Sequence, residues 1–307
     1  MEIQSLEHID FDRLHRGFQA AFCDYAISFD KEELRSMLER RGYVPRLSFA
    51  AFEGDEIVAF TLNAIGTFGG VATAYDTGTG TSPAWRGRGL AGEIFARALP
   101  HLRQEGIGQY LLEVLRSNGA AIEVYRRMGF EVVRELDCFR QSVGEIAPCR
   151  AAPCGVVEVD AERVAEARTF LDFRPSWQNG IESIVRGRRG LVCLGAFDGA
   201  ILAGYCVFDP DTGDVAQIAV RPEARRRGVA TQLLGEAVAR MKASAVKVLN
   251  VDARDSAMHS FLANRNIAPA ANQLEMIRVI GNEERNRNRN GASDTAPVAR
   301  GGCRESL

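Results

Sequence analysis

Glycines and arginines gather in the stretch WRGRGLAGEIF, which spans residues 85–95. The stretch follows a predicted strand and opens a predicted helix, so the free N–H groups of the first helical turn point at whatever lies in front of them. Glycine lets the backbone approach a phosphate closely, and the neighbouring arginines add positive charge. The stretch predicts an anion site. Gly87, Gly89 and Gly92 also match the dinucleotide fingerprint G-x-G-x-x-G, so an NAD-dependent oxidoreductase is one alternative.

A second copy of this stretch begins 139 residues later, where residues 225–237 align with residues 86–98. Only one fingerprint glycine, Gly89, has a glycine counterpart. The pattern that both copies keep is Arg-x-x-Gly-x-Ala, formed by Arg86, Gly89 and Ala91 and by Arg225, Gly228 and Ala230. A phosphate turn for NAD follows the first strand of a parallel unit, whereas this one follows an antiparallel meander. The repeat therefore disfavours the NAD interpretation.

A second group of polar residues lies on a predicted helix at 118–128. Asn118, Ala121 and Tyr125 are spaced i, i+3 and i+7, so they share one helix face. Asn118 can cap the helix, and Gly129 can end it. Ala121 leaves room for a ligand along this face. The structural alternative for Tyr125 is a core residue with its hydroxyl at the surface.

Both motifs together resemble the GCN5-related N-acetyltransferase (GNAT) family. Residues 86–91 resemble its pyrophosphate motif, Q/R-x-x-G-x-G/A, and residues 118–130 resemble its second signature, N-x-x-A-x-x-x-Y-x-x-x-G-F. The resemblance implies acetyl-CoA as acyl donor and the amine of a small molecule or peptide as acceptor. It also implies that Asn118 contacts the pantetheine arm and that Tyr125 protonates the departing thiolate. The residues it assigns to the cofactor are Arg86, Gly87, Arg88, Gly89, Leu90, Ala91 and Asn118, with Arg225, Gly228 and Ala230 in the second copy.

The second copy departs from the second signature. Ala257 and Phe261 align with Ala121 and Tyr125, and Arg254 stands at the position of Asn118. Phenylalanine cannot donate a proton. This copy is therefore interpreted as a half that binds acyl-CoA without that acid, as a non-enzymatic sensor of CoA ligands, or as a structural partner.

The general base is left open between two acidic residues. Asp76 and Glu113 lie on the two central strands predicted for the first copy, from which either could take a proton through water. Both also fit purely structural roles. A strand N–H near residues 79–82 would polarise the thioester carbonyl.

The predicted elements that position these residues occur twice. Residues 47–66 and 191–210 each read as a strand, a glycine-containing turn and a second strand. Helices are predicted at 10–24 and 30–41, and an apolar stripe from Leu90 to Leu102 predicts a third. The fold class is α/β (α+β): two tandem GNAT-like domains, each a mixed, mostly antiparallel sheet flanked by helices.

Domain limits follow from the repeat. The first GNAT-like domain is predicted at residues 1–143 and the second at 156–280. The intervening residues 144–155 contain two prolines and no periodicity, as expected of a linker. Residues 281–307 are polar and repetitive, which predicts a disordered tail.

Composition argues against several classes of partner. The 307 residues carry a net charge of −2, so no global field attracts nucleic acid. No apolar run approaches the roughly 20 residues of a membrane span, and no secretory signal is visible, which favours a cytoplasmic location. The seven cysteines and four histidines lack the spacing of metal ligands, so no metal is expected. The sequence leaves open the oligomeric state and the choice between acetyl and longer acyl donors.

Overall fold

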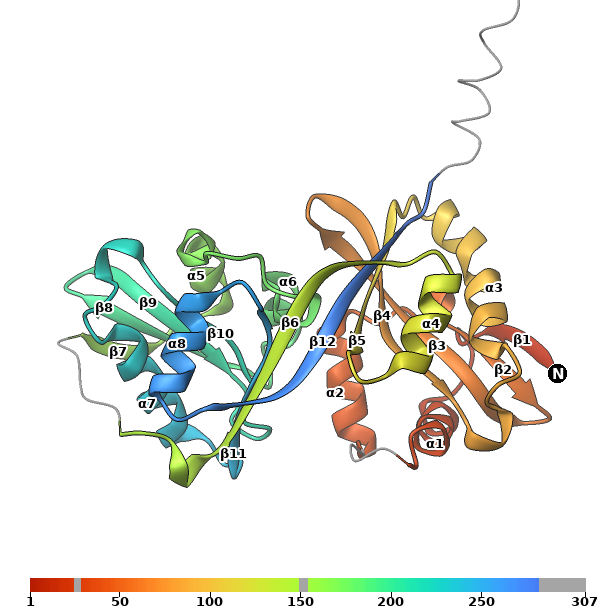
Figure 1. Cartoon of the computed structure of the whole chain (residues 1–307), viewed down its shortest axis with the longest axis horizontal. Helices are drawn as coiled ribbons and strands as arrows, with labels where there is room; N and C mark the ends of the chain where they lie inside the picture. Colours follow the sequence, from red (N-terminus) through yellow and green to blue (C-terminus); the bar gives the residue numbers. More distant parts are fainter. Residues whose placement is uncertain (25–28, 149–153, 282–307) are drawn as a thin grey trace, which may run out of the picture.

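Short apolar strands separated by glycine turns build two lobes. The computed structural model describes residues 1–24, 29–148 and 154–281 of the chain. Below, the first half means residues 1–143 and the second half residues 156–280. Residues 149–153 of the predicted linker and residues 282–307 of the predicted tail lie outside the described residues. The two lobes lie side by side, and two long strands cross from one to the other (Figure 1). None of the described helices combines the length and the apolarity needed to cross a membrane.

The elements of the two halves follow one another in nearly the same order. Those of the first half are β1 (Glu2–Ser5), α1 (Phe11–Ala21), α2 (Lys31–Arg41), β2 (Phe49–Glu53), β3 (Glu56–Phe68), β4 (Val71–Thr81), α3 (Leu90–Gln104), β5 (Gln109–Leu115), α4 (Gly119–Arg127) and β6 (Glu131–Ser142). Those of the second half are β7 (Gly155–Glu158), α5 (Ala161–Glu166), α6 (Ile181–Arg186), β8 (Val192–Asp198), β9 (Ile201–Phe208), β10 (Val215–Val220), α7 (Val229–Arg240), β11 (Ala245–Asp252), α8 (Ser256–Asn264) and β12 (Ala268–Val279).

The sheet of the first half is mixed, as predicted. Strands β1 to β4 pair antiparallel, and β4 pairs with β5 in parallel over residues 73–75 and 109–111 only. Beyond this short pairing β4 and β5 have no further paired residues. Helices α1 and α2 pack on one face of the sheet, and α3 and α4 pack on the other. The predicted α/β fold with helix-flanked sheets is confirmed.

Local sequence explains where the key helices begin. The predicted apolar stripe of α3 is confirmed, because its six residues from Leu90 to Leu102 are all buried. Gly89 precedes this helix in the left-handed conformation, with φ of 80°. Asn118 caps α4, since its side-chain oxygen accepts a hydrogen bond from the Ala121 N–H at 3.1 Å.

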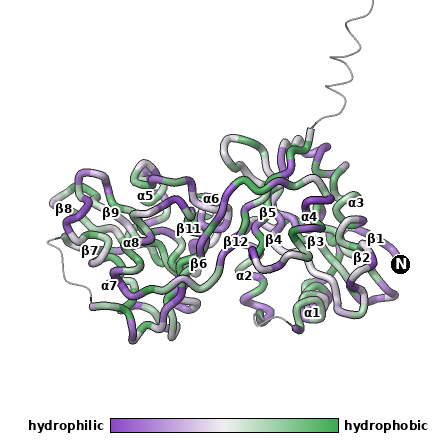
Figure 2. Tube along the Cα trace, viewed as in Figure 1, coloured by the Kyte–Doolittle hydropathy of each residue, from purple (hydrophilic) through white to green (hydrophobic). Residues whose placement is uncertain are grey.

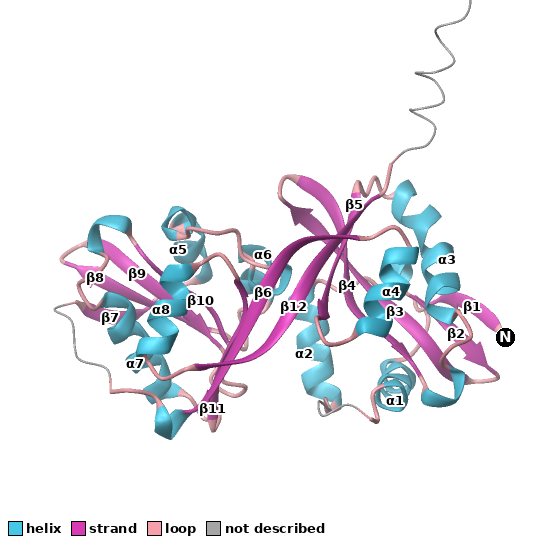
Figure 3. Cartoon of the chain, in the orientation of Figure 1, coloured by secondary structure: helices cyan, strands magenta, loops and turns pink. Residues whose placement is uncertain are grey.

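The two halves exchange their last strands. The larger sheet has the order β1-β2-β3-β4-β5-β12-β6-β11, so β12 from the second half lies between β5 and β6 (Figure 3). Leu274 and Met276 of β12 fill the first-half core, while Phe139 of β6 packs into the second-half core. The larger sheet contains strands from both sides of the predicted limits at residues 143 and 156.

Charged residues accompany the crossing strands. Hydrophilic positions recur along β6 where it passes between the lobes (Figure 2). Among them, Arg134 is almost completely buried and bonds Glu275 of β12 at 2.6 Å. A buried guanidinium needs such a partner, because an unpaired charge is expensive to remove from water. The exchange is therefore fixed by both apolar and ionic contacts.

Candidate active site

The glycine-rich loop of the first half forms an open cradle before α3. Gly87 and Gly89 have φ of 76° and 80°, in the left-handed region that favours glycine. No side chain caps α3, so the first N–H groups of the helix have no side-chain acceptor. A Cβ added at Gly87 or Gly89 would meet nothing within 4 Å, which leaves space in front of the loop. Leu90 is buried beneath the loop, and the exposed Arg88 lies over the Trp85 ring.

The leading arginine of each loop ties the loop to the end of the first helix of its half or to the residues that follow that helix. Arg86 bonds the Thr81 carbonyl at 3.1 Å, the Ala21 carbonyl at 3.1 Å and the Asp24 carboxylate at 2.7 Å. Arg225 makes the same three kinds of contact, with the Val220 carbonyl at 3.1 Å, the Phe170 carbonyl at 3.0 Å and the Asp172 carboxylate at 3.1 Å. Both arginines therefore position their loops, and direct contact with an anion stays a prediction for each.

The structure brings Tyr125 and Asp76 together. The Tyr125 hydroxyl on α4 lies 3.3 Å from an Asp76 carboxylate oxygen on β4. Both line a pocket of about 10 Å³ that also touches Thr79 and Ala91. Tyr125 packs edge-on against Phe130, which holds its ring beside the sheet. Because Asn118 caps the same helix, its amide oxygen is already used within the fold.

Asp76 owes its position to a bulge in β4. Register shifts between Leu62 and Asn63, which pair with Gly78 and Asp76, so Thr77 is the extra residue. The Asp76 carboxylate accepts hydrogen bonds from the Thr79 hydroxyl at 2.7 Å and from the Gly78 N–H at 2.9 Å. Burial raises the pKa of Asp76 to about 6, against the lowering effect of these hydrogen bonds. The carboxyl group therefore titrates close to neutral pH.

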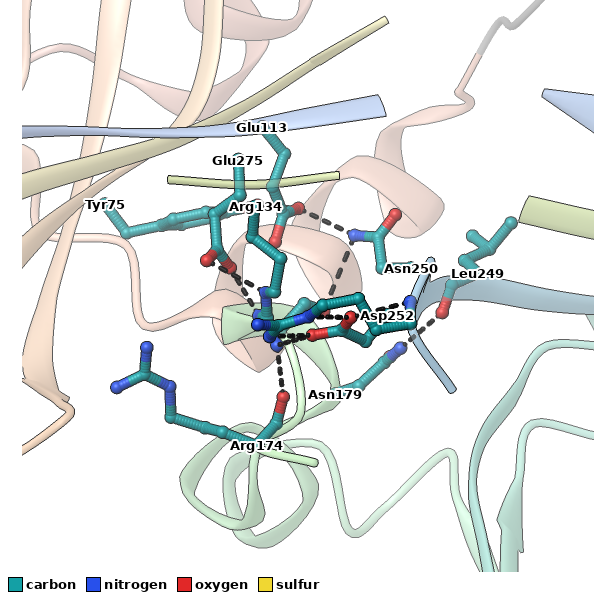
Figure 4. Close-up of polar contacts among 11 residues, drawn as sticks. Tyr75, Glu113, Arg134, Arg174, Asn179, Leu249, Asn250, Asp252 and Glu275 are labelled. Atoms are coloured by element: carbon teal, nitrogen blue, oxygen red, sulfur yellow. Dashed lines mark hydrogen bonds and ion pairs between the residues drawn. The ribbon is translucent and has the colours of Figure 1, made fainter. Parts of the chain in front are cut away.

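Glu113, the other predicted base, lies away from this pair. Side chains alternate along β5, and Tyr110 and Leu112 face α3 and α4, so Glu113 points to the opposite face. There it accepts hydrogen bonds from the Tyr75 hydroxyl and the Asn250 amide, both at 2.9 Å (Figure 4). Burial, followed by the nearby Glu275, raises the pKa of Glu113 to about 7. The structure therefore places Glu113 between the halves.

Glu113 is surrounded by a buried ionic cluster, which was not predicted from the sequence. Arg134 lies between Glu275 at 2.6 Å and Asp252 at 3.6 Å, and Figure 4 shows these groups converging from both halves. A strand whose charged side chains are buried in such a cluster has the same alternating sequence as a strand whose charged side chains face solvent. The sequence therefore contained no signal for this cluster. Thr79, which bonds Asp76, was also missed, although it follows the candidate base by three residues.

The second half repeats the loop and the bulge without the reactive groups. Its β10 is bulged at Ala216, and Val215 stands where the first half has Asp76. Its loop reaches φ of 61° at Arg226 and 87° at Gly228. Arg225, Arg226 and residues 228–230 of the loop line a cleft of about 650 Å³ between β10, α7 and α8. The cleft therefore has a loop like that of the first half but no carboxylate at the bulge.

The alignment of the second signature in this half was wrong by one residue. Asp255 caps α8 through the Met258 N–H, as Asn118 caps α4 through the Ala121 N–H. Asn266 has φ of 60° and takes the place of Gly129. Leu262, rather than Phe261, therefore corresponds to Tyr125, and the conclusion that this half lacks the hydroxyl is unchanged.

The chain is similar to curated acetyltransferases over parts of its length. It is 26% identical over 126 residues to the mycothiol acetyltransferase of Corynebacterium aurimucosum, a match that covers 41% of this chain and 37% of that protein. It is 41% identical over 66 residues to the mycothiol acetyltransferase of Saccharomonospora viridis, which is 22% of each chain. The matched segments thus span well under half of these relatives.

Solved structures resemble the chain over nearly its whole length. A tandem GNAT protein from the clavulanic acid biosynthesis pathway superposes with a TM-score of 0.70 at 16% identity, covering 91% of this chain and 98% of that one. A GCN5-related N-acetyltransferase from Sphaerobacter thermophilus gives 0.67 at 15% identity, with coverage of 91% and 95%. The model of the acetyltransferase (GNAT) family matches residues 14–130 and again residues 160–265, together well over half of the chain. The chain therefore belongs to the GNAT acetyltransferase family, as a tandem member.

Proposed function

We propose that the first half transfers an acetyl group from acetyl-CoA to the amine of a small molecule or peptide. The observation that carries this proposal is the Tyr125–Asp76 contact of 3.3 Å beside the open glycine loop. Membership of the GNAT family supports acetyl-CoA as the donor. The partial matches to mycothiol acetyltransferases favour a small-molecule acceptor over a peptide.

The proposed reaction is direct attack by a neutral amine. The amine nitrogen bonds to the thioester carbonyl carbon, and the C–S bond then breaks with its electrons on sulfur. Tyr125 gives its proton to the departing thiolate, while the Asp76 carboxylate takes a proton from the nitrogen. The contact between the two groups lets that proton return to Tyr125. A strand N–H among residues 79–81 would stabilise the oxyanion, since the Ser82 N–H already donates to the Val58 carbonyl at 2.9 Å. The net change moves one proton from nitrogen to sulfur.

Tyr125→Phe should lower kcat by about 10- to 100-fold, the low end for general acid catalysis, because a thiolate can leave unassisted. The affinity for acetyl-CoA should stay close to that of the unmodified chain, since the ring and its packing on Phe130 are kept. The measurement is thiol release with an acceptor amine, together with calorimetry of acetyl-CoA binding. Equal kcat values with chemistry rate-limiting would leave Tyr125 as a packing residue.

Asp76→Asn should lower kcat by roughly 10- to 100-fold and remove the acid limb of the pH profile. A general base works only when it is deprotonated, so kcat should rise with pH through about 6, the pKa of Asp76, and then level off. Glu113→Gln is the matched control, because Glu113 titrates at about 7 on the other face of the sheet. A limb that survives in Asp76→Asn and disappears in Glu113→Gln would assign the base to Glu113.

A second candidate function applies to the second half, which we infer to be a non-catalytic binding site for CoA ligands. The cleft of about 650 Å³ and the intact Arg225–Ala230 loop favour binding, while Val215 and Leu262 replace the reactive pair. Calorimetry should then find two acetyl-CoA molecules per chain. A stoichiometry of one that is unchanged by Gly228→Val would eliminate this candidate.

A further inference from the structure

A separate cavity of about 240 Å³ lies at the junction of the two halves, and we name it the seam pocket. One wall is the β3–β4 hairpin of the first half, residues 66–69. The opposite wall comes from the second half, at and between α5 and α6. The pocket therefore exists only when both halves are assembled, and it includes none of the residues of the Tyr125–Asp76 site.

Three arginines line the seam pocket. Arg168 and Arg174 have exposed side chains at its rim, and Arg186 is half-buried. No described carboxylate forms an ion pair with any of the three, and the rim has one acidic residue, Glu182. Arg186 donates to the carbonyls of Arg40 and Arg41, at 3.0 and 3.3 Å, and burial lowers its pKa. The pocket thus holds an excess of positive charge that the described fold does not neutralise.

The floor of the pocket consists of buried aromatic side chains. Trp177 stacks on Tyr75 with ring centroids 5.1 Å apart and planes within 8°, and its indole N–H donates to the Arg41 carbonyl. The Tyr205 hydroxyl donates to the Gln217 amide oxygen at 2.9 Å. These side chains already have partners, so the floor offers a preformed flat surface. A bound molecule would therefore draw its charged contacts from the arginines above.

We propose that the seam pocket binds a small molecule that carries a carboxylate or phosphate group. Guanidinium groups recognise both kinds of anion through paired N–H donors, and the space suits a compact ligand. One of these arginines already contacts the hairpin wall, because the Arg174 guanidinium lies 4.1 Å from the centre of the Phe68 ring. A ligand held by Arg168 and Arg174 therefore touches both halves and stabilises their junction. This proposal does not depend on the chemistry assigned to Tyr125.

Trp177 provides a direct reporter for the test. The chain has two tryptophans, so Trp85→Phe leaves Trp177 on the pocket floor as the only one. Its fluorescence is titrated with succinate for carboxylates, glycerol 3-phosphate for phosphate esters, and uncharged glycerol. Coenzyme A is present throughout at saturation, so that probe anions do not occupy the glycine loops. We expect a saturable change with at least one anion and none with glycerol.

Arginine variants in the same background locate the binding. Replacing both Arg168 and Arg174 by Gln should weaken binding at least about tenfold, since charge-assisted hydrogen bonds are lost. Arg163→Gln is the matched control, because Arg163 is exposed on α5, pairs with Glu166 and does not line the pocket. The proposal would be overturned if neither anion gave a saturable change. It would also be overturned if the double variant and the control bound the anion with equal affinity. If coenzyme A does not bind, the proposed function fails, while the arginine comparison still decides this proposal.

Discussion

A chain that ends at residue 267, just before β12, is expected to lose cooperative folding in both halves. Leu274 and Met276 would leave the first-half core, where both are buried. Losing one such side chain typically costs 2–5 kcal/mol, against a total stability of about 5–15 kcal/mol. Arg134 would also lose Glu275, leaving a buried charge with a weaker partner. Thermal unfolding followed by circular dichroism should show no sharp transition.

A chain that ends at residue 281 is the control, because it keeps every described element. Fragments 1–147 and 154–281, produced together, should associate, since each supplies a strand that the other lacks. A sharp melting transition in the chain ending at residue 267, near that of the control, would show that the exchanged strand is dispensable.

The exchange of strands illustrates what the sequence could not reveal. The order of helices and strands and the repeat follow from periodicity, turns and motifs. The residues of β6 and β12, in contrast, alternate in the same way whether each strand pairs within its own half or with the other. Pairing between distant segments depends on the long-range packing of residues such as Phe139 and Met276, which local patterns do not encode.

Gly89→Val should reduce acetyl-CoA affinity at the first half by roughly 100-fold or more, with a matching loss of turnover. At φ of 80° a β-branched residue is strained, and its side chain would stand in the open space before α3. Losing two charge-assisted hydrogen bonds to a phosphate, at about 1.5–3 kcal/mol each, accounts for a change of this size. Calorimetry and thiol release measure the two effects.

Gly228→Val is the matched control, since Gly228 occupies the same place before α7 with φ of 87°. It imposes the same strain on the other loop, and most turnover should survive. A loss of activity as large as that of Gly89→Val would show that the second half carries the chemistry. Normal acetyl-CoA binding by Gly89→Val would mean that the loop does not hold the cofactor.

The candidate site was predictable only where residue types constrain geometry. The cap at Asn118 was predicted from the sequence, and the structure has it. The left-handed conformation of Gly87 and Gly89 was not predicted, although glycine is the residue that adopts it most readily. The one-residue error in the second half came from matching Ala257 and Phe261 by identity. The better signal was Asn266, because asparagine tolerates the left-handed conformation that Gly129 adopts. Glu113 directly follows Leu112 on the same strand, so alternation along the strand places Glu113 on the face of the sheet opposite to Leu112.

The exchanged strands also determine when the first half can finish folding during synthesis. About 140 residues separate the end of β6 from the end of β12. At 5–20 residues per second, a ribosome needs about 7–30 s to make that stretch. Throughout that interval β5 lacks the strand that lies beside it in the finished sheet, and such an open edge invites pairing with other chains. The first half, although synthesised before the second, therefore completes its fold only after β12 has emerged.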